Sequence, residues 1–525
     1  MPQSPPSLSS SDATVYVGTP HLAIEDVLAV AEGRARLALD PSPAVRERLI
    51  QSQRAVAELR KKGGTLYGVT TGVGASIGNA IPAELHAELP RNLFRFHGVG
   101  TGRLLDETES AAVLMTRAAS LARGYSGVRP ELIERLCELV NRRILPCIPS
   151  EGSVGASGDL TPLSYVAALL AGEREVIIDG QIVPATTALR DHGLEPLDLD
   201  PKESLAVMNG TSVMCALACI AFTRCERLAR TSCAITAGLS DVVHGNPAHF
   251  DDRISQARPH PGQGLAARWI REDLAGSETT RVPASVQDRY SIRCAPQIVG
   301  VLLDALRMAR EWVEIELSGA NDNPLIDPET GEALHGGNFY GGHMCFVLDG
   351  LKSATASIAD MLDRQLILLC SPDTSDGLPE NLVARSGADR VVHHGFKAMQ
   401  ITASALTAEA LKLTMPASAF SRSTESHNQD KVSMGSIAAR DCLRILELSE
   451  TVAAILLLAV AQAVDLRDPD IVSHRVRALH ARIRKSVEPN TADRRQDHDI
   501  ASVLVMLRAD DLPVGDTSDT PNRSS

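Results

Sequence analysis

Glycines crowd around one alanine–serine pair in the N-terminal half of the chain. Residues 152–162 read GSVGASGDLTP, with glycine on both sides of Ala156 and Ser157. Glycine permits sharply bent backbone and close approaches that a Cβ atom blocks. In such a turn the Gly158 nitrogen can reach the Ala156 carbonyl carbon, and loss of water from the ring and from Ser157 leaves an exocyclic methylene group. The segment therefore predicts an electrophile made from the protein's own backbone.

The longer stretch GSVGASGDLTPLS resembles the signature of the histidine, phenylalanine and tyrosine ammonia-lyase family. Members of that family form 4-methylideneimidazol-5-one from an Ala-Ser-Gly triplet, here Ala156, Ser157 and Gly158. Further segments follow in the family's order from about Tyr67 to about Asp465. The resemblance implies an ammonia-lyase that uses this self-made group. Gly72, Gly74 and Gly78 miss the GxGxxG spacing, so no nucleotide cofactor is expected, and no metal is expected either.

Three of those segments carry side chains that match catalytic or substrate-binding positions of the family. Tyr67, in YGVTTGVG, would remove the β-proton of the substrate. Because a free tyrosine has a pKa of about 10, its surroundings must make it basic if it is to work near neutral pH. Asn209, in VMNGT, would hydrogen-bond the electrophile or the substrate. In YSIRCAPQ, Arg293 would hold the substrate carboxylate through two parallel hydrogen bonds, and Tyr290 would orient the reacting groups.

Two later regions complete the resemblance. NDNPL and HGGNF resemble two more family segments, which implies that Phe339 lies against the active-site ring. For Asn323 and Asn338 a turn role alone stays open as the alternative to a role in the site. ESHNQDKVSM resembles a loop that closes on the substrate, with polar contacts from Asn428 and Gln429. Histidine-preferring members usually carry glutamate where Gln429 stands, and a neutral amide cannot pair with an imidazole that gains charge. This position disfavours histidine as the substrate.

The dyad Phe96-His97, in NLFRFHGVG, is where the family reads the aromatic ring of its substrate. Tyrosine-preferring members tend to carry His-Leu, phenylalanine-preferring members Phe-Leu, and histidine-preferring members Ser-His. Phe-His departs from all three. Phe96 favours an unsubstituted or weakly polar ring, whereas His97 either faces a ring substituent or fills the core.

Elimination of ammonia from phenylalanine or tyrosine, giving an arylacrylate, is therefore the expected reaction. An aromatic amino acid 2,3-aminomutase and a histidine ammonia-lyase stay open as alternatives, as does a catalytically silent oligomeric scaffold. Family members are homotetramers whose active sites combine residues from three chains, so a homotetramer is expected. A serine hydrolase is disfavoured because Asp159 stands where G-x-S-x-G needs its second glycine, and no Cys or His spacing suits tetrahedral zinc.

The composition of the chain limits which partners it can bind and which cellular compartment is expected. A net charge of −13 is the wrong sign for neutralising phosphates, which argues against nucleic acid as a partner. The ten cysteines are scattered without a CxxC pair, which indicates reduced thiols in a cytoplasmic protein. The longest apolar run, Val452 to Val464, is shorter than the roughly 20 residues needed to cross a bilayer, so it predicts a buried core helix and no membrane span.

Aromatic residues make up only 3% of a chain that is 44% hydrophobic, so small and aliphatic side chains must fill the core, which favours an all-α fold. We expect a long central helical bundle and a loop-rich N-terminal region that carries the prosthetic group. Residues 1–12 are predicted to be a disordered leader, and 13–220 an N-terminal region with the Tyr67 loop and the electrophile. Residues 221–510 are predicted to form the bundle, and 511–525 a disordered tail. The predicted long helices are 295–317, 343–369, 403–413 and 436–465.

Overall fold

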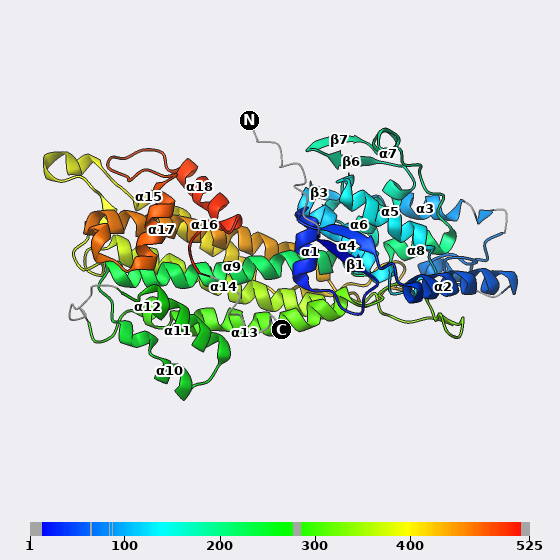
Figure 1. Cartoon of the computed structure of the whole chain (residues 1–525), viewed down its shortest axis with the longest axis horizontal. Coiled ribbons are helices and arrows are strands. Elements are labelled where there is room, and N and C mark those ends of the chain that lie inside the picture. The colour runs from blue at the N-terminus through cyan, green and yellow to red at the C-terminus, as the bar shows by residue number, and fades with distance from the viewer. Residues whose placement is uncertain (1–12, 64–65, 83–84, 87, 277–284, 516–525) are drawn as a thin grey trace. The chain divides into compact units, whose positions relative to one another are not determined.

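The fold was analysed in a computed structural model that describes residues 13–63, 66–82, 85–86, 88–276 and 285–515. Helices make up 60% of it and strands only 7%, which confirms the all-α class. The chain divides into two compact units (Figure 1). The first comprises Met1–Ile220, Arg310–Leu348 and Pro416–Arg440, and the second comprises Ala221–Ala309, Asp349–Met415 and Asp441–Ser525.

The helices have the following bounds: α1 Ile24–Ala31, α2 Pro43–Lys61, α3 Leu89–Phe96, α4 Glu107–Leu121, α5 Pro130–Asn141, α6 Leu160–Leu170, α7 Ala185–Asp191, α8 Pro201–Met208, α9 Ser212–Val242, α10 Asp252–Ala257, α11 Pro261–Asp273, α12 Tyr290–Arg293, α13 Ala295–Leu317, α14 Gly342–Cys370, α15 Lys397–Lys412, α16 Gly435–Arg467, α17 His474–Arg484 and α18 Asp497–Arg508. The strands are β1 Thr14–Val17, β2 Arg36–Leu39, β3 Thr101–Leu104, β4 Leu145–Pro146, β5 Pro149–Glu151, β6 Glu175–Ile178, β7 Gln181–Pro184, β8 Leu325–Ile326 and β9 Ala333–Leu334.

Helix α4 forms the centre of the first unit. Asp106 caps it by accepting a hydrogen bond from the Glu109 N–H at 2.8 Å, and Glu109 returns one from the Asp106 N–H at 2.9 Å, the reciprocal pattern that satisfies two orphan donors at a helix start. Every residue from Glu109 to the end of the helix is buried. Helices α1 and α5 pack against α4, and the small side chains of α4 let them approach closely.

One short sheet in this unit matters for the site. Strands β3 and β5 pair antiparallel, with Thr101 opposite Glu151 and Leu104 opposite Pro149. Strand β3 follows the Phe96-His97 dyad in the chain, and β5 directly precedes the glycine-rich stretch that begins at Gly152. The pairing therefore brings two loops together that lie some fifty residues apart in the sequence.

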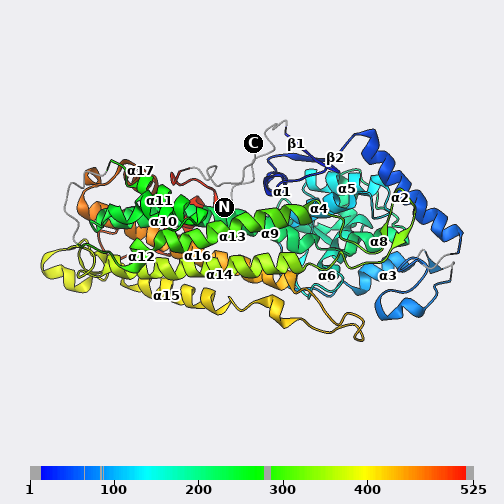
Figure 2. The ribbon, with the colours of Figure 1, turned by 90° about the horizontal axis from the view of Figure 1, so that it is seen from below.

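The second unit is a bundle in which parts of the long helices α9, α13, α14 and α16 lie side by side (Figure 2). The predicted helix 295–317 is confirmed at the same bounds, and 343–369 and 436–465 each extend by one or two residues at either end. Helix α15 begins at Lys397, six residues before the predicted start, because packing outweighs the weak helix propensity of Ile401 and Thr402. Ala356, Ala410, Ile445 and Leu448 form an apolar cluster that joins α14, α15 and α16.

The apolar run Val452–Val464 lies inside α16, and its hydrophobic side chains are at most 3% exposed, which confirms a buried core helix. Within the described residues, no helix has both the length and the apolar character needed to span a bilayer. All ten cysteines are free, and nine of them are buried. The predicted disordered segments 1–12 and 516–525 lie outside the described residues, whereas Leu512 and Val514, also assigned to the tail, are buried.

Candidate active site

The glycine-rich stretch folds as a tight turn between β5 and α6. Ser157 has φ +52°, and Gly155 and Gly158 have φ +76° and +77°, so three of the residues 155–159 adopt left-handed backbone. A Cβ atom on Gly158 would stand 2.0 Å from the Gly210 carbonyl oxygen, a distance that no side chain tolerates. Glycine is therefore required at this position. We call residues 155–159 the electrophile turn.

The segment between α8 and α9, which contains Asn209 and Gly210, holds the electrophile turn through hydrogen bonds. The Asn209 side-chain amide donates to the Ser157 carbonyl oxygen at 3.1 Å, and the Gly210 N–H donates to the same oxygen at 3.3 Å. In return, the Asp159 N–H donates to the Gly210 carbonyl at 2.7 Å. Asn209 is 3% exposed, and its Oδ1 atom has no hydrogen-bond partner among the described residues.

Asp159 anchors the other end of the turn. Its carboxylate is fully buried and accepts hydrogen bonds from the Met214 N–H at 2.9 Å, from Ser153 Oγ at 3.3 Å and from Ser436 Oγ. Burial raises the pKa of Asp159 to about 6, although these hydrogen bonds oppose the shift. The sequence interpretation used Asp159 only to argue against a hydrolase and missed this anchoring function.

Tyr67 lies beside the turn, on its own glycine loop. Its hydroxyl oxygen accepts a hydrogen bond from the Gly74 N–H at 2.7 Å. Burial raises the pKa of Tyr67, the Gly74 hydrogen bond lowers it, and the carboxylate of Glu425 raises it further. The sequence analysis expected these surroundings to make Tyr67 basic enough to work near neutral pH. In the structure they raise its pKa, so the phenol keeps its proton there.

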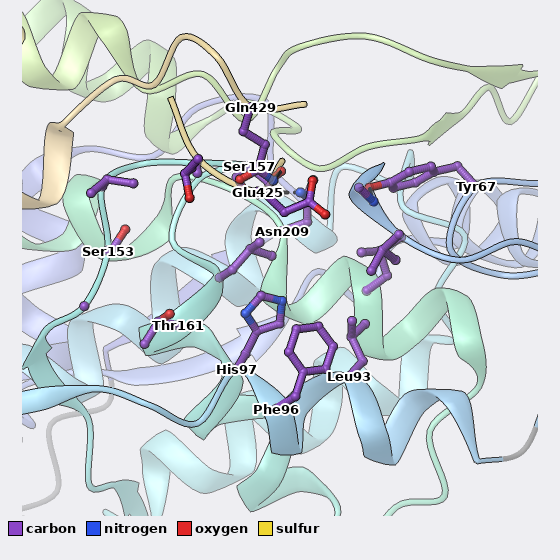
Figure 3. A pocket seen from close by; sticks show the side chains of 18 residues that line it. Tyr67, Leu93, Phe96, His97, Ser153, Ser157, Thr161, Asn209, Glu425 and Gln429 are labelled. Carbon is purple, nitrogen blue, oxygen red and sulfur yellow. Dashed lines mark hydrogen bonds between the residues drawn. The ribbon is translucent and has the colours of Figure 1, made fainter. Parts of the chain in front are cut away.

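These residues line one cavity of about 240 Å³ (Figure 3). Figure 3 shows Phe96 and His97 at one end, Ser157, Glu425 and Gln429 at the other, and Tyr67 to one side. Seven predicted site residues line the cavity: Tyr67, Phe96, His97, Ala156, Ser157, Asn209 and Gln429. A second cavity of about 570 Å³ shares part of this wall and includes the predicted residues Phe339 and Asn428.

The turn at residues 424–429, called here the facing turn, contributes two polar side chains to the cavity. Gln429 Nε2 donates to Ser157 Oγ at 3.1 Å. Both carboxylate oxygens of Glu425 lie 2.9 Å from the Ala75 N–H, which donates to them. The sequence analysis did not select Glu425, although an acidic residue four positions before Gln429 in the same segment was a usable signal.

The Phe96-His97 dyad ends helix α3. The two rings lie 4.1 Å apart at an interplanar angle of 35°, and Phe96 remains 56% exposed. Burial lowers the pKa of His97 to about 4, so its imidazole is neutral near pH 7. A neutral imidazole offers one hydrogen-bond donor and one acceptor. Of the two alternatives left open for His97, its place in the cavity wall favours contact with a ring substituent.

Tyr290 and Arg293 belong to the second unit and are not among the residues that line this cavity. Tyr290 is 71% exposed. The Arg293 guanidinium lies 4.6 Å from the centre of the Tyr290 ring and donates to the Asp288 carbonyl at 3.0 Å. Asn323 accepts from the Gly336 N–H at 2.9 Å, a turn contact of the kind the sequence allowed.

No group of three or more His, Cys, Asp or Glu side chains that could hold a metal ion occurs among the described residues. Residues 22–485 match the family described as aromatic amino acid lyase. The histidine ammonia-lyases of Koribacter versatilis and Aromatoleum aromaticum are 39% and 41% identical to this chain, over 91% and 92% of it and 93% and 91% of their own lengths.

Solved structures agree with these relatives. The tyrosine aminomutase of Streptomyces globisporus superposes with a TM-score of 0.87 at 35% identity, covering 95% of this chain and 97% of its own. The histidine ammonia-lyase of Trypanosoma cruzi superposes with a TM-score of 0.86 at 30% identity, covering 95% of each chain.

Proposed function

The chain belongs to the aromatic amino acid lyase family and is a carbon–nitrogen lyase, and on that premise we propose that it removes ammonia from L-histidine to give imidazolylacrylate. The observation that carries the proposal is the cavity wall, where Tyr67, the neutral imidazole of His97 and the Ala156-Ser157 pair of the bent turn face one space. Phenylalanine or tyrosine was the expected substrate, but the relatives named histidine ammonia-lyase do not support that preference. Histidine, the alternative, fits them better.

Members of the family generally depend on 4-methylideneimidazol-5-one, and the residues present fit that group. The left-handed Ser157, the space at Gly158 that excludes a Cβ atom, and the unpartnered buried Oδ1 of Asn209 are the features that favour its formation here. When formed, the group supplies an electrophilic carbon for the amino group of the substrate. We propose that it forms from Ala156, Ser157 and Gly158.

Two side chains around the turn would bind the substrate ammonium group and remove the β-proton. Among the described residues that line the cavity, Glu425 carries the one carboxylate, so it would attract the substrate ammonium group. Tyr67 would take the β-proton as the carbon–nitrogen bond breaks, leaving ammonia and the arylacrylate. A bound ammonium next to Glu425 would offset the negative charge that adds to the effect of burial on the pKa of Tyr67, so a larger fraction of Tyr67 would be ionised when substrate is present.

Ring recognition would fall to His97. Its neutral imidazole can donate to, or accept from, the nitrogens of a substrate imidazole, whereas a phenyl ring offers no such partner. Gln429 spoke against histidine in the sequence because it replaces a glutamate. In the structure its amide donates to Ser157 Oγ, the hydroxyl that would leave as water when the electrophile forms, so this hydrogen bond belongs to the turn before ring closure.

The substrate carboxylate would need a cation that this cavity wall lacks. Arg293 remains the best candidate, with Tyr290 beside it, and both would come from a neighbouring copy in a homotetramer. A mixing experiment tests this: Ser157→Ala and Arg293→Ala chains, each inactive alone, should regain part of the activity when co-expressed. No recovery in a confirmed mixed oligomer would contradict the shared site.

Near-ultraviolet absorbance of the enzyme with L-histidine, L-phenylalanine and L-tyrosine separately tests the substrate. We expect the conjugated acrylate to appear fastest from histidine and to be absent with Ser157→Ala. A faster rise from phenylalanine or tyrosine would overturn the histidine proposal while keeping the lyase. Intact-mass analysis should show the loss of two waters in the parent and not in Ser157→Ala.

A 2,3-aminomutase is the second candidate, favoured by the likeness to tyrosine aminomutase. The same residues would serve if the acrylate stayed bound and ammonia added again at the β-carbon. Chromatography of the reaction mixture for a β-amino acid separates the two reactions, because a lyase releases only acrylate and ammonia.

A further inference from the structure

Arg174, from a distant part of the sequence, packs against the C-terminal end of helix α3, where the Phe96-His97 dyad lies. Arg174 Nη2 donates to the Phe94 carbonyl at 3.2 Å. Its guanidinium occupies the space where a Cβ atom of Gly98 would stand, with Nη2 only 1.4 Å from that position. The same guanidinium lies 4.2 Å from the centre of the Tyr165 ring, a cation–π contact.

The neighbouring residue makes a second connection to the same helix. Glu173 accepts two hydrogen bonds from the Arg95 guanidinium, at 2.9 and 2.7 Å, in the paired geometry that orients both side chains. Residues 173 and 174 therefore contact two of the last three residues of α3, Phe94 and Arg95, and also Gly98 just beyond the helix. The carbonyls at a helix end lack partners within the helix, and a cation there is favourable.

This connection leads directly back to the electrophile. Helix α6 begins at Leu160, one residue after Asp159, and ends at Leu170, a few residues before Glu173. Helices α3 and α6 pack against each other within the first unit. Helix α6 thus follows the electrophile turn at its N-terminal end, and the residues beyond its C-terminal end, Glu173 and Arg174, contact α3. This arrangement sets the distance between Ser157 and the Phe96-His97 dyad.

Phe96 needs such a support because its own packing does not hold it. Its side chain is 56% exposed, and its ring contact in the described structure is with His97. A buried aromatic ring is held by its neighbours, whereas a half-exposed ring is placed by its backbone. The backbone of the last turn of α3 is what Arg174 contacts.

We propose that Arg174, with Glu173, is a positioning residue for ring recognition: it holds the Phe96-His97 end of α3 at a set distance from Ser157 and thereby determines which aromatic ring the cavity prefers. The inference rests on the proposed function only in requiring that an aromatic substrate occupies this cavity. It does not depend on which ring is preferred.

Equilibrium binding of three arylacrylates, without ammonia, tests the proposal by calorimetry: imidazolylacrylate, cinnamate and 4-hydroxycinnamate. For Arg174→Gln we expect the Kd of the parent's best ligand to rise by about fivefold or more, and the spread among the three to shrink. The mass loss of two waters should stay unchanged, because the electrophile turn does not contact Arg174. Arg174→Lys should restore part of the selectivity, since its ammonium can still donate to the Phe94 carbonyl.

Two further variants separate positioning from general destabilisation. Arg190→Gln removes an exposed arginine from the same unit and should leave all three Kd values as in the parent. Gly98→Ala should act like Arg174→Gln, because the new methyl group displaces the guanidinium. Gly98→Ala should then add little in an Arg174→Ala background, since the clash is gone, giving a non-additive double-mutant cycle.

Three results would overturn the inference: no change in any Kd with Arg174→Gln, the same fold rise for all three ligands, or full additivity of the Gly98 and Arg174 substitutions. A parent enzyme that binds none of the three acrylates would instead overturn the proposed function, and with it the premise of this inference.

Discussion

The electrophile turn and the facing turn meet across one cavity but are built in opposite ways. The electrophile turn is held by buried partners at both ends, and Asp159 is fully buried. In the facing turn, residues 425–428 are exposed, and Glu425, Ser426 and His427 all have positive φ, between +51° and +63°. Non-glycine residues in that region cost about 1–3 kcal/mol each.

This difference shows that one wall of the cavity is held rigidly while the opposite wall is open to solvent. Ring closure needs two backbone atoms held close together, so the electrophile turn must be rigid. The facing turn supplies Glu425 and Gln429 through contacts that solvent can reach, namely a hydrogen bond from the Asn428 N–H to the Glu425 carbonyl at 3.0 Å and a bridge between Thr424 and Gln429. Polar groups on such a turn can adjust as a substrate enters and a product leaves.

The largest expected effect comes from the centre of the rigid turn. Ser157→Ala removes the hydroxyl that is lost as water, so we expect activity to fall by at least about a thousandfold. Steady-state kinetics and intact mass check this together. Ser502→Ala on α18 is a matched control that should retain full activity. A Ser157→Ala enzyme with near-normal turnover would show that the turn is structural only.

Tyr67→Phe should lower kcat by about a hundredfold to ten-thousandfold, because the ring remains but the proton acceptor is lost. The two-water mass loss should persist, since Tyr67 does not hold the electrophile turn. Tyr16→Phe, at an exposed tyrosine on β1, serves as the control. Loss of the mass change in Tyr67→Phe would mean that the phenol acts in forming the group as well.

Asp159 should make stability depend on pH in a defined direction. Its folded pKa of about 6 exceeds the ordinary value of 3.8, so the unfolded chain loses this proton first. Stability contributed by the protonated form is therefore complete below about pH 4 and is lost as the pH rises to about 6, amounting to about 3 kcal/mol. Denaturant titrations from pH 4 to 7 should show this fall in the parent and a flatter profile in Asp159→Asn. Parallel profiles would exclude the buried carboxyl as the cause.

The smallest expected effect belongs to the facing turn. Glu425→Gln keeps an oxygen that can accept from the Ala75 N–H but removes the charge, so KM for the amino acid should rise about tenfold. Without the carboxylate the pKa of Tyr67 should fall, which moves the rising limb of the kcat pH profile to lower pH. Glu329→Gln, on an exposed turn of the same unit, controls for loss of one charge. An unchanged KM with an unshifted pH profile would remove Glu425 from substrate binding.

Much of this site could be predicted from short motifs of neighbouring residues in the sequence. The Ala156-Ser157-Gly158 triplet, the Tyr67 loop and the Asn209-Gly210 pair are short local patterns, and seven predicted side chains do line one cavity. The helical class and the long helices followed in the same way, because helix propensity and apolar content are properties of contiguous residues. The dyad Phe96-His97 was also identified locally, although the apolar Phe96, together with Gln429, led to a preferred ring that the named relatives do not support.

The sequence by itself predicted what adjacent residues can supply: an Ala-Ser-Gly turn proposed to form the electrophile, a phenol and a helical frame. Only the tertiary structure decided which distant groups control them. Gln429 reaches Ser157 across 272 positions, and Ser436 reaches Asp159 across 277. Asp159 and Arg174 carry no local signature of their roles, because a charge acquires its pKa and its partner from burial and from chain crossings that are formed only when the whole unit folds.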